Sequence, residues 1–322
     1  MLDAIQNFAQ QFSYSPEIVN GNKLKAAESF IVAGMGGSQL AAGLLKDYAP
    51  KLNVLQHRNY DLPEIPKALE KKTLVIISSY SGNTEEILDS FRRARKKKLP
   101  VAVLTAGGTL LTLAHKHKVP YIELPDKKIE PRSAIGYSFQ ALLALTKQTK
   151  ILKDASQLVN ILKPSHSQFT GQALAQKLKH LTPVIYASEA NQSLAYFWKI
   201  TLNETAKIPA FFNVLPELNH NEMTSYESHP DTHALIKPFA FLLLHDSDDH
   251  PRIQKRMTIL ENLFRERHLP IHPLLLEGTR RLQRMFNAII LAEWTAYYTS
   301  QFYRTNPDQV PMIEDFKKRM EL

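Results

Sequence analysis

Hydroxyl-bearing side chains crowd around one glycine in the segment 78–85, which reads Ser-Ser-Tyr-Ser-Gly-Asn-Thr-Glu. The apolar, β-branched run Leu74–Ile77 precedes this segment and predicts a buried strand, and Glu85–Lys98 predicts a helix. Hydroxyls and backbone N–H groups at the start of a helix suit an anion, because the helix dipole places partial positive charge there. The segment therefore predicts a phosphate site.

A helix-capping box is the structural alternative for this segment. It would explain one Ser or Thr and the Glu that follows. It would not explain why Ser79, Ser81 and Thr84 all surround the same glycine, Gly82.

A second strand-to-helix joint lies earlier in the chain. A predicted strand, Phe30–Ala33, is followed by Gly-Met-Gly-Gly-Ser at 34–38 and by a predicted helix, Gln39–Tyr48. A dinucleotide fingerprint would need Gly or Ala at position 39, and a Walker loop would need Gly-Lys-Ser/Thr. Taken alone, the glycines also fit a tight structural turn. Two such turns on neighbouring strands predict one small phosphorylated ligand held from both sides.

The composition bounds the class of protein. A chain of 322 residues is long enough for two domains, and 44% hydrophobic with 22% charged residues is typical of a soluble globular protein. No apolar run approaches the roughly 18 residues of a membrane span. The start, Met1–Ile5, lacks the pattern of a signal peptide, and the absence of cysteine excludes disulfides and thiolate chemistry. We expect a cytoplasmic protein without a membrane partner.

The net charge of +9 favours an anionic substrate or nucleic acid. The densest basic run, Arg92–Lys98, closes the predicted helix after the hydroxyl loop, where cations complement the helix dipole. No aromatic residues interleave with the run, and no helix-turn-helix pattern is present. The run therefore indicates a solvated helix end, and no nucleic-acid partner is expected.

Strand-like runs alternate with helical stretches in both halves of the chain, which predicts parallel sheets built from βαβ units. The expected strands are 30–33, 54–57, 74–78, 101–105 and 121–124, then 184–187, 210–212, 239–244 and 271–276. Residues 133–162 look mostly helical, and a polar break at Pro164–Gly171 looks like a linker. The predicted fold is α/β, with two doubly wound, mainly parallel-sheet domains (1–163 and 164–322), a long helix at 280–303 and a basic tail.

Ligands of open α/β sheets bind beyond the carboxyl ends of the strands. In the second half these ends carry Ser-Glu-Ala-Asn at 188–191 and His-Asp-Ser-Asp at 245–248. The acids of the latter suit phosphate badly, so we expect one phosphate site per chain, in the first half.

The hydroxyl segment resembles the phosphosugar loop of the sugar isomerase (SIS) domain, which commonly reads Ser-x-Ser-Gly-x-Thr-x-Glu. The resemblance implies that Ser79, Ser81 and Thr84 bind the phosphate. It also implies that Gly36, Gly37 and Ser38 complete the sugar pocket.

Further stretches resemble the bifunctional phosphoglucose/phosphomannose isomerases, a family with two SIS domains. They are Glu-Pro-Arg-Ser-Ala-Ile-Gly-Tyr at 130–137, Leu-Asn-Glu-Thr-Ala-Lys at 202–207, Leu-Pro-Glu-Leu-Asn-His-Asn-Glu at 215–222 and Ile-Glu-Asp-Phe-Lys at 313–317. The resemblance covers nearly the whole chain, and 215–222 is its most specific part. It implies a homodimer with shared active sites that interconverts glucose 6-phosphate and fructose 6-phosphate, and mannose 6-phosphate as well, without a metal or other cofactor.

The resemblance also implies a role for each catalytic candidate. Glu204 moves the proton between C2 and C1, Arg132 stabilises the enediolate, and His220 opens the sugar ring with assistance from Lys317. Phe197 occupies a position that is often basic in the family.

Each of these residues has an ordinary alternative role. Glu204 could be a surface carboxylate, Arg132 the partner of a nearby acid, and Lys317 a solvated tail residue. His220 could be an ordinary loop histidine, but the flanking Asn219, Asn221 and Glu222 offer partners able to fix its tautomer. A zinc site at His220, His229 and His233 is disfavoured, because Pro230 interrupts any helical face between the last two.

Other functions remain open at this point. A sugar-phosphate sensor would keep the loop without needing Glu204 or His220, and would usually carry a DNA-binding module. Glutamine-dependent glucosamine-phosphate synthesis also uses paired SIS domains, but it needs a cysteine glutaminase, and this chain has no cysteine. An isomerase of another phosphosugar is a further alternative.

Overall fold

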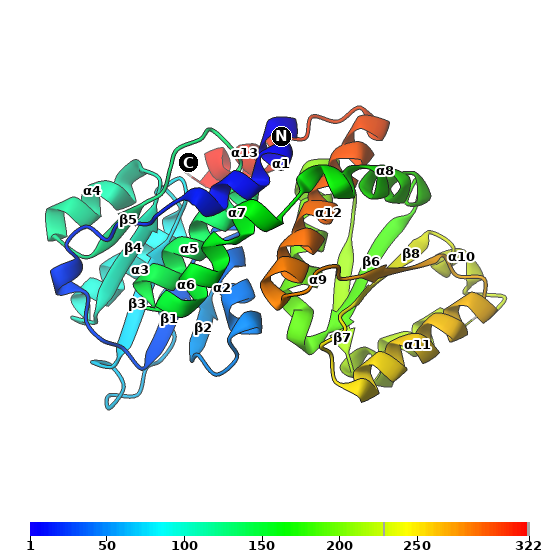
Figure 1. The fold of residues 1–322 in the computed structure, drawn as a ribbon, viewed down its shortest axis with the longest axis horizontal. Helices are drawn as coiled ribbons and strands as arrows, with labels where there is room; N and C mark the ends of the chain where they lie inside the picture. The colour runs from blue at the N-terminus through cyan, green and yellow to red at the C-terminus, as the bar shows by residue number, and fades with distance from the viewer. Residues whose placement is uncertain (228, 321–322) are drawn as a thin grey trace. The chain divides into compact units, whose positions relative to one another are not determined.

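Two compact units make up the chain in the computed structural model, which describes residues 1–227 and 229–320 (Figure 1). The first unit is Asn7–Leu162, and the second starts at Lys163 and includes Met1–Gln6. The short helix α1 (Leu2–Gln6) contacts the long helix α12 (Arg281–Tyr303), and its Ile5 is fully buried. The division into SIS domains at 163/164 stays a prediction, except that the first six residues pack with the second unit.

The first unit is built on a five-stranded sheet in the order β2-β1-β3-β4-β5, with every pair of neighbours parallel. Its strands are β1 (Ser29–Ala33), β2 (Val54–His57), β3 (Thr73–Ser78), β4 (Val101–Thr105) and β5 (Tyr121–Glu123). All five strands predicted for this half are confirmed.

Helices cover both faces of this sheet (Figure 1). Val75 and Ile77 of β3 share a core cluster with residues of α3 (Glu85–Lys96) and α4 (Gly108–His117). Two other helices, α2 (Gly37–Tyr48) and α5 (Ile135–Leu145), pack against each other and contact strands of the same sheet. The apolar strands lie buried between these layers, as the predicted doubly wound fold requires.

The second unit holds a four-stranded parallel sheet in the order β7-β6-β8-β9. Its strands are β6 (Thr182–Ser188), β7 (Phe211–Leu215), β8 (Phe239–His245) and β9 (Ile271–Leu275). Phe241 of β8 packs with Leu260 and Phe264 of α11 (Pro251–Glu266), while α9 (Gln192–Thr201) contacts β6, β7 and α12. Both predicted sheets are therefore confirmed.

The predicted linker at Pro164–Gly171 is wrong. This stretch forms the 3-10 turn η4 (Pro164–Ser167) and the start of α8 (Gln168–Lys177), and both elements pack on α12. Trp294 Nε1 donates a hydrogen bond of 2.8 Å to the Pro164 carbonyl oxygen. A Cβ added at Gly171 would lie 2.6 Å from Trp294 Cβ, so α8 packs closely against α12 at this glycine.

The predicted basic tail forms a helix, α13 (Pro311–Met320). The remaining short elements are α6 (Thr149–Ser156), α7 (Leu158–Ile161), α10 (His233–Ile236), the π turn η6 (Leu202–Ala206) and the 3-10 turns η1 (Phe8–Ser13), η2 (Gly21–Lys23), η3 (Pro131–Ser133), η5 (Glu189–Asn191), η7 (Glu217–His220) and η8 (Glu222–Tyr226). Among the described residues, no helix combines the length and apolar character needed to cross a bilayer.

Candidate active site

The hydroxyl loop between β3 and α3 is held by its own side chains. Ser79 Oγ lies 2.9 Å from Thr84 Oγ1, and the Gly82 N–H donates to Ser79 Oγ at 3.1 Å. Thr84 occupies the N-cap position of α3 but makes no side-chain capping hydrogen bond. The capping-box alternative therefore fails. The side chain of Thr84 does not bind the free N–H groups at the positive end of α3.

Two glycines fix the backbone of this loop against the turn after β4. Gly82 has φ +72°, and a Cβ there would lie 1.8 Å from the Gly107 carbonyl oxygen. Gly108 has φ +69°, and a Cβ there would lie 2.3 Å from the Ser81 carbonyl oxygen. Asn83 Oδ1 accepts a hydrogen bond of 2.9 Å from the Thr109 N–H. The loop is therefore shaped by close backbone contact that no larger residue permits.

Ser38 joins the two predicted anion-binding loops. Its Oγ accepts a hydrogen bond from the Tyr80 N–H at 2.9 Å, and its carbonyl oxygen accepts one from Ser78 Oγ at 3.0 Å. Gly36, with φ +49°, precedes α2, and a Cβ added at Gly37 would lie 2.5 Å from the Arg132 backbone nitrogen. The start of α2 thus touches both the hydroxyl loop and the turn that carries Arg132.

Arg132 is buried, with 2% of its surface exposed, and its Nη1 lies 3.3 Å from Glu130 Oε2. A residue that sequence reasoning missed supports its turn. Gln11 donates from Nε2 to the Ser133 carbonyl oxygen at 2.7 Å, and its Oε1 accepts from the Gly136 N–H at 2.9 Å. No local pattern signals this role, because Gln11 lies more than a hundred residues away in the chain.

The first unit therefore contains most of the predicted site residues, and the start of α2 contacts both the hydroxyl loop and the turn of Arg132. The predicted site residues of this unit are Gly36, Gly37, Ser38, Ser79, Ser81, Thr84 and Arg132. The other three candidates, Glu204, His220 and Lys317, belong to the second unit.

Glu204 lies on the π turn that ends α9, and its side chain is partly buried. Lys207, which adopts a left-handed backbone conformation with φ +59°, donates from Nζ to the Glu204 carbonyl oxygen. A π turn at the end of an α-helix shifts the side chains off the regular 3.6-residue register, and such turns are frequent at functional sites.

His220 is exposed at the end of η7, and the expectation that its neighbours fix its tautomer is wrong. Asn219 Oδ1 accepts from Arg256 at 3.3 Å, and Asn221 Nδ2 donates to Glu217 at 2.8 Å. Glu222 also points its carboxylate elsewhere. Among the described residues, none forms a hydrogen bond with the His220 ring.

Glu222 anchors the segment that carries His220. Its Oε1 accepts from the Tyr186 hydroxyl at 2.5 Å, and its Oε2 accepts from Asn213 Nδ2 at 2.5 Å. Burial, together with this hydrogen bond, raises the pKa of Tyr186 above its ordinary value. The Tyr186 phenol therefore remains a hydrogen-bond donor. Tyr186 of β6 and Asn213 of β7 together hold Glu222, and with it the segment that carries His220, in place.

Strand β7 separates Glu204 from His220 along the chain. Glu204 precedes the amino end of this five-residue strand and His220 follows its carboxyl end. A strand of that length spans about 16 Å at about 3.3 Å per residue. Along the chain, the two candidates therefore lie on opposite sides of this strand.

Lys317 and Phe197 lie in contrasting surroundings. Lys317 is exposed on α13, and its Nζ lies 2.9 Å from Glu314 Oε1. Phe197 is fully buried on α9, so this position contributes core packing where a basic residue is common in the family it resembles.

The carboxyl ends of β6 and β8 carry an ionic network whose extent the sequence does not reveal. Arg284 Nε donates to Asp246 Oδ1 at 2.9 Å, and Arg281 Nη1 donates to Asp246 Oδ2 at 3.1 Å. Asp248 also contacts Arg284. The acids at this strand end bind the arginines of α12, which supports the expectation that phosphate binds only in the first half.

The histidines considered for zinc do not gather. His229 Nδ1 accepts from the Asp231 N–H at 3.3 Å, and His233 begins α10. Within residues 1–227 and 229–320, no group of three or more His, Cys, Asp or Glu side chains could hold a metal ion.

Comparison with known proteins gives the family. Residues 168–320 match the family model described as "Bacterial phospho-glucose isomerase C-terminal SIS domain". The "Bifunctional phosphoglucose/phosphomannose isomerase" of Caldicellulosiruptor bescii is 32% identical, with 99% of this chain and 98% of that protein covered. The chain belongs to the bifunctional phosphoglucose/phosphomannose isomerase family.

Other relatives agree with this membership. The family member from Aquifex aeolicus is 29% identical, with 98% of this chain and 97% of that protein covered. A solved structure of glucosamine-6-phosphate deaminase from Thermotoga maritima superposes with a TM-score of 0.71 at 14% identity, covering 96% of this chain and 97% of that one. The latter likeness shows the shared SIS fold.

Proposed function

We propose that this protein interconverts glucose 6-phosphate and fructose 6-phosphate, and mannose 6-phosphate as well, by aldose–ketose isomerisation that needs no metal ion. In a chain of this family, the observation that carries the proposal is the contact of the hydroxyl loop with the start of α2 and, through Gly37, with the turn of buried Arg132. It provides a phosphate-binding element and a fixed positive charge in one unit.

The phosphate binds at the amino end of α3, among Ser79, Ser81 and Thr84, and supplies binding energy remote from the reacting carbons. Gly36, Gly37 and Ser38 line the sugar. The helix end can accept an anion, because the Thr84 hydroxyl is engaged with Ser79 rather than with the backbone of α3.

Isomerisation starts when His220 moves a proton from the O1 hydroxyl to the ring oxygen, so that the ring opens and C1 becomes a carbonyl. Glu204 then removes the C2 proton. The electrons of the broken C–H bond form the C1=C2 double bond, and the carbonyl oxygen becomes an enediolate oxygen that Arg132 stabilises. Transfer of the O2 proton to O1 and return of the carried proton from Glu204 to C1 leave the ketose. Lys317 assists at the ring.

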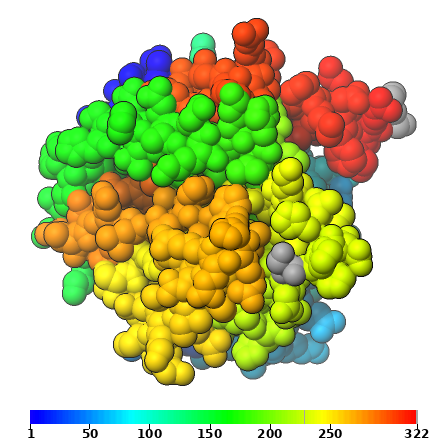
Figure 2. Space-filling model, turned by 90° about the vertical axis from the view of Figure 1, so that its right-hand side faces the viewer, coloured from blue at the N-terminus to red at the C-terminus, as the bar shows by residue number. Residues whose placement is uncertain are grey.

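The proposal includes a homodimer with shared active sites, which the position of β7 between Glu204 and His220 in the chain supports. An exposed histidine without a ring partner among the described residues is suited to a neighbouring copy. The face of α13 supports association too, since Met312 and Phe316 are 84% and 62% exposed. Figure 2 shows α13, coloured red, at the edge of the second unit. A cytoplasmic location stays a prediction.

The experiment is an assay of the purified protein, after EDTA treatment, for fructose 6-phosphate formed from each aldose phosphate. We expect both substrates to react, because C2 epimers share one enediol. Activity that EDTA abolishes and zinc restores would contradict the proposed mechanism. Absence of product from both substrates would contradict the proposed function.

A further inference from the structure

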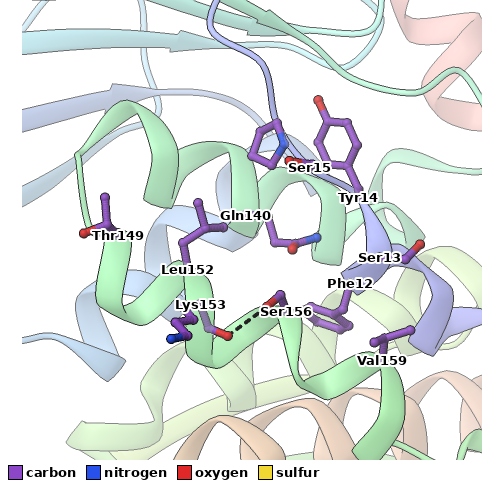
Figure 3. A pocket seen from close by; sticks show the side chains of 11 residues that line it. Phe12, Ser13, Tyr14, Ser15, Gln140, Thr149, Leu152, Lys153, Ser156 and Val159 are labelled. Atoms are coloured by element: carbon purple, nitrogen blue, oxygen red, sulfur yellow. Dashed lines mark hydrogen bonds between the residues drawn. The ribbon is translucent and has the colours of Figure 1, made fainter.

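A pocket of about 390 Å³ lies in the first unit, outside the proposed active site. It opens between the segment Phe12–Pro16 and helices α5, α6 and α7 (Figure 3). Its volume falls within the roughly 300–1,000 Å³ of pockets that hold small molecules. None of its lining residues belongs to the hydroxyl loop, the start of α2 or the Arg132 turn.

The lining presents oxygen acceptors that lack donors. Ser13 Oγ donates to the Gln10 carbonyl oxygen at 2.8 Å, and Ser156 Oγ donates to the Lys153 carbonyl oxygen at 2.8 Å. Each hydroxyl has thus used its proton on the backbone and can only accept from a ligand.

Gln140 adds a third acceptor at the floor. It is fully buried on α5, and its Nε2 donates to the Gln11 carbonyl oxygen at 2.7 Å, which fixes the orientation of the amide. Its Oε1 is then left without any hydrogen-bond partner among the described residues. A buried polar atom without a partner costs free energy, and this oxygen has no accessible surface, so a donor group of the ligand would be stabilising here once neighbouring side chains shift to admit it.

One cation completes the lining. Lys153, on α6, is exposed and is the sole charged residue of the pocket lining, and it makes no ion pair with a residue of the described ranges. Phe12, Leu152 and Val159 supply apolar surface beside the polar groups. Three acceptors, one cation and no acid favour a ligand with several hydroxyl groups and one negative charge.

We propose that this pocket binds a small polyhydroxylated anion, with hydroxyls toward Ser13, Ser156 and Gln140 and the anionic group at Lys153. The carboxylate of a sugar acid and the phosphate of a polyol phosphate share this chemistry. The proposal is independent of the isomerase activity, and each can fail without the other.

Titrations of the 15N-labelled full chain, followed by amide NMR, test the site. The probes are D-gluconate for a carboxylate, glycerol 1-phosphate for a phosphate and D-sorbitol as the uncharged control. We expect saturable shifts at the lining residues with at least one anion and about tenfold weaker binding of sorbitol, the effect of one hydrogen bond to a charged group. Tighter binding of D-gluconate would identify the anionic group of the ligand as a carboxylate, and tighter binding of glycerol 1-phosphate would identify it as a phosphate.

Variants locate the bound anion. Lys153→Met should weaken binding about tenfold, whereas Lys150→Met, on the same helix outside the lining, should leave it unchanged. Ser15→Tyr, at the exposed rim, should block the pocket by bulk. Shifts confined to the hydroxyl loop, no shifts with either anion, or equal affinity in Lys153→Met would overturn the proposal.

Discussion

Glu204 is the residue on which the proposed proton transfer depends. It sits on a π turn, and Lys207 holds the backbone there. Glu204→Gln keeps the shape and removes the base, so kcat should fall by about 10²–10⁴ with a modest change in KM. Exchange of the substrate C2 proton with solvent deuterium should stop as well, and exchange at the wild-type rate would contradict the assignment.

Glu222 is expected to act through the position of the His220 segment. Glu222→Ala leaves the Tyr186 hydroxyl and the Asn213 amide without their acceptor, which should lower the free energy of unfolding by about 2–4 kcal/mol. Denaturant unfolding measures this loss. In the double variant with Tyr186→Phe, which removes one stranded donor, the loss should be smaller than the sum of the two single losses. An additive result would show that the pair is not coupled.

At the scale of elements, the β3–α3 loop and α3 form one anion-binding unit. Ser81→Ala combined with Thr84→Ala should mainly raise KM for phosphorylated sugars, because the lost hydrogen bonds serve ground state and transition state alike. Inhibition by inorganic phosphate should weaken in parallel. If KM is unchanged while stability falls, the loop only shapes the start of the helix.

Strands β8 and β9 carry two partly buried histidines that make the second unit sensitive to acid. Burial lowers the pKa of His245 and of His272, and Lys177 lowers that of His272 further. Below the ordinary pKa of about 6.5, the unfolded chain binds more protons than the folded one, so stability is present above that pH and is lost as the pH falls. Thermal unfolding at pH 7.5 and 5.5 measures this loss, and His272→Gln should reduce it. An identical pH dependence in that variant would exclude His272 as a cause.

At the scale of the whole molecule, the proposed shared sites can be tested by complementation. Glu204→Gln and His220→Ala are each expected to be inactive. If they are unfolded and refolded together, about half of the dimers are mixed, and one site of each mixed dimer carries neither change. About a quarter of wild-type activity should then return. If His220 serves its own chain, every site retains one lesion and no activity returns.

Much of the architecture could be predicted from local sequence. Buried parallel strands such as Leu74–Ile77 are short continuous apolar runs, and the joints after them are marked by glycines and hydroxyls, so all nine strands and both strand-to-helix turns were predictable. The linker prediction failed at Pro164–Gly171. Its small and polar residues suit either an exposed linker or a closely packed helix, and only the contact with Trp294 shows that this segment is packed.

For the candidate site, the sequence alone determined the residue types and the chemistry that they permit: hydroxyls for a phosphate, an arginine for an enediolate, a carboxylate and a histidine for proton transfer. Only the tertiary structure decided their partners. Ser38 meets Tyr80, Gly37 meets Arg132, and Glu222 binds Tyr186 instead of fixing His220. Such contacts join residues far apart in the chain. The packing of whole strands and helices determines them, so the residues next to a site residue in the sequence do not reveal its partners.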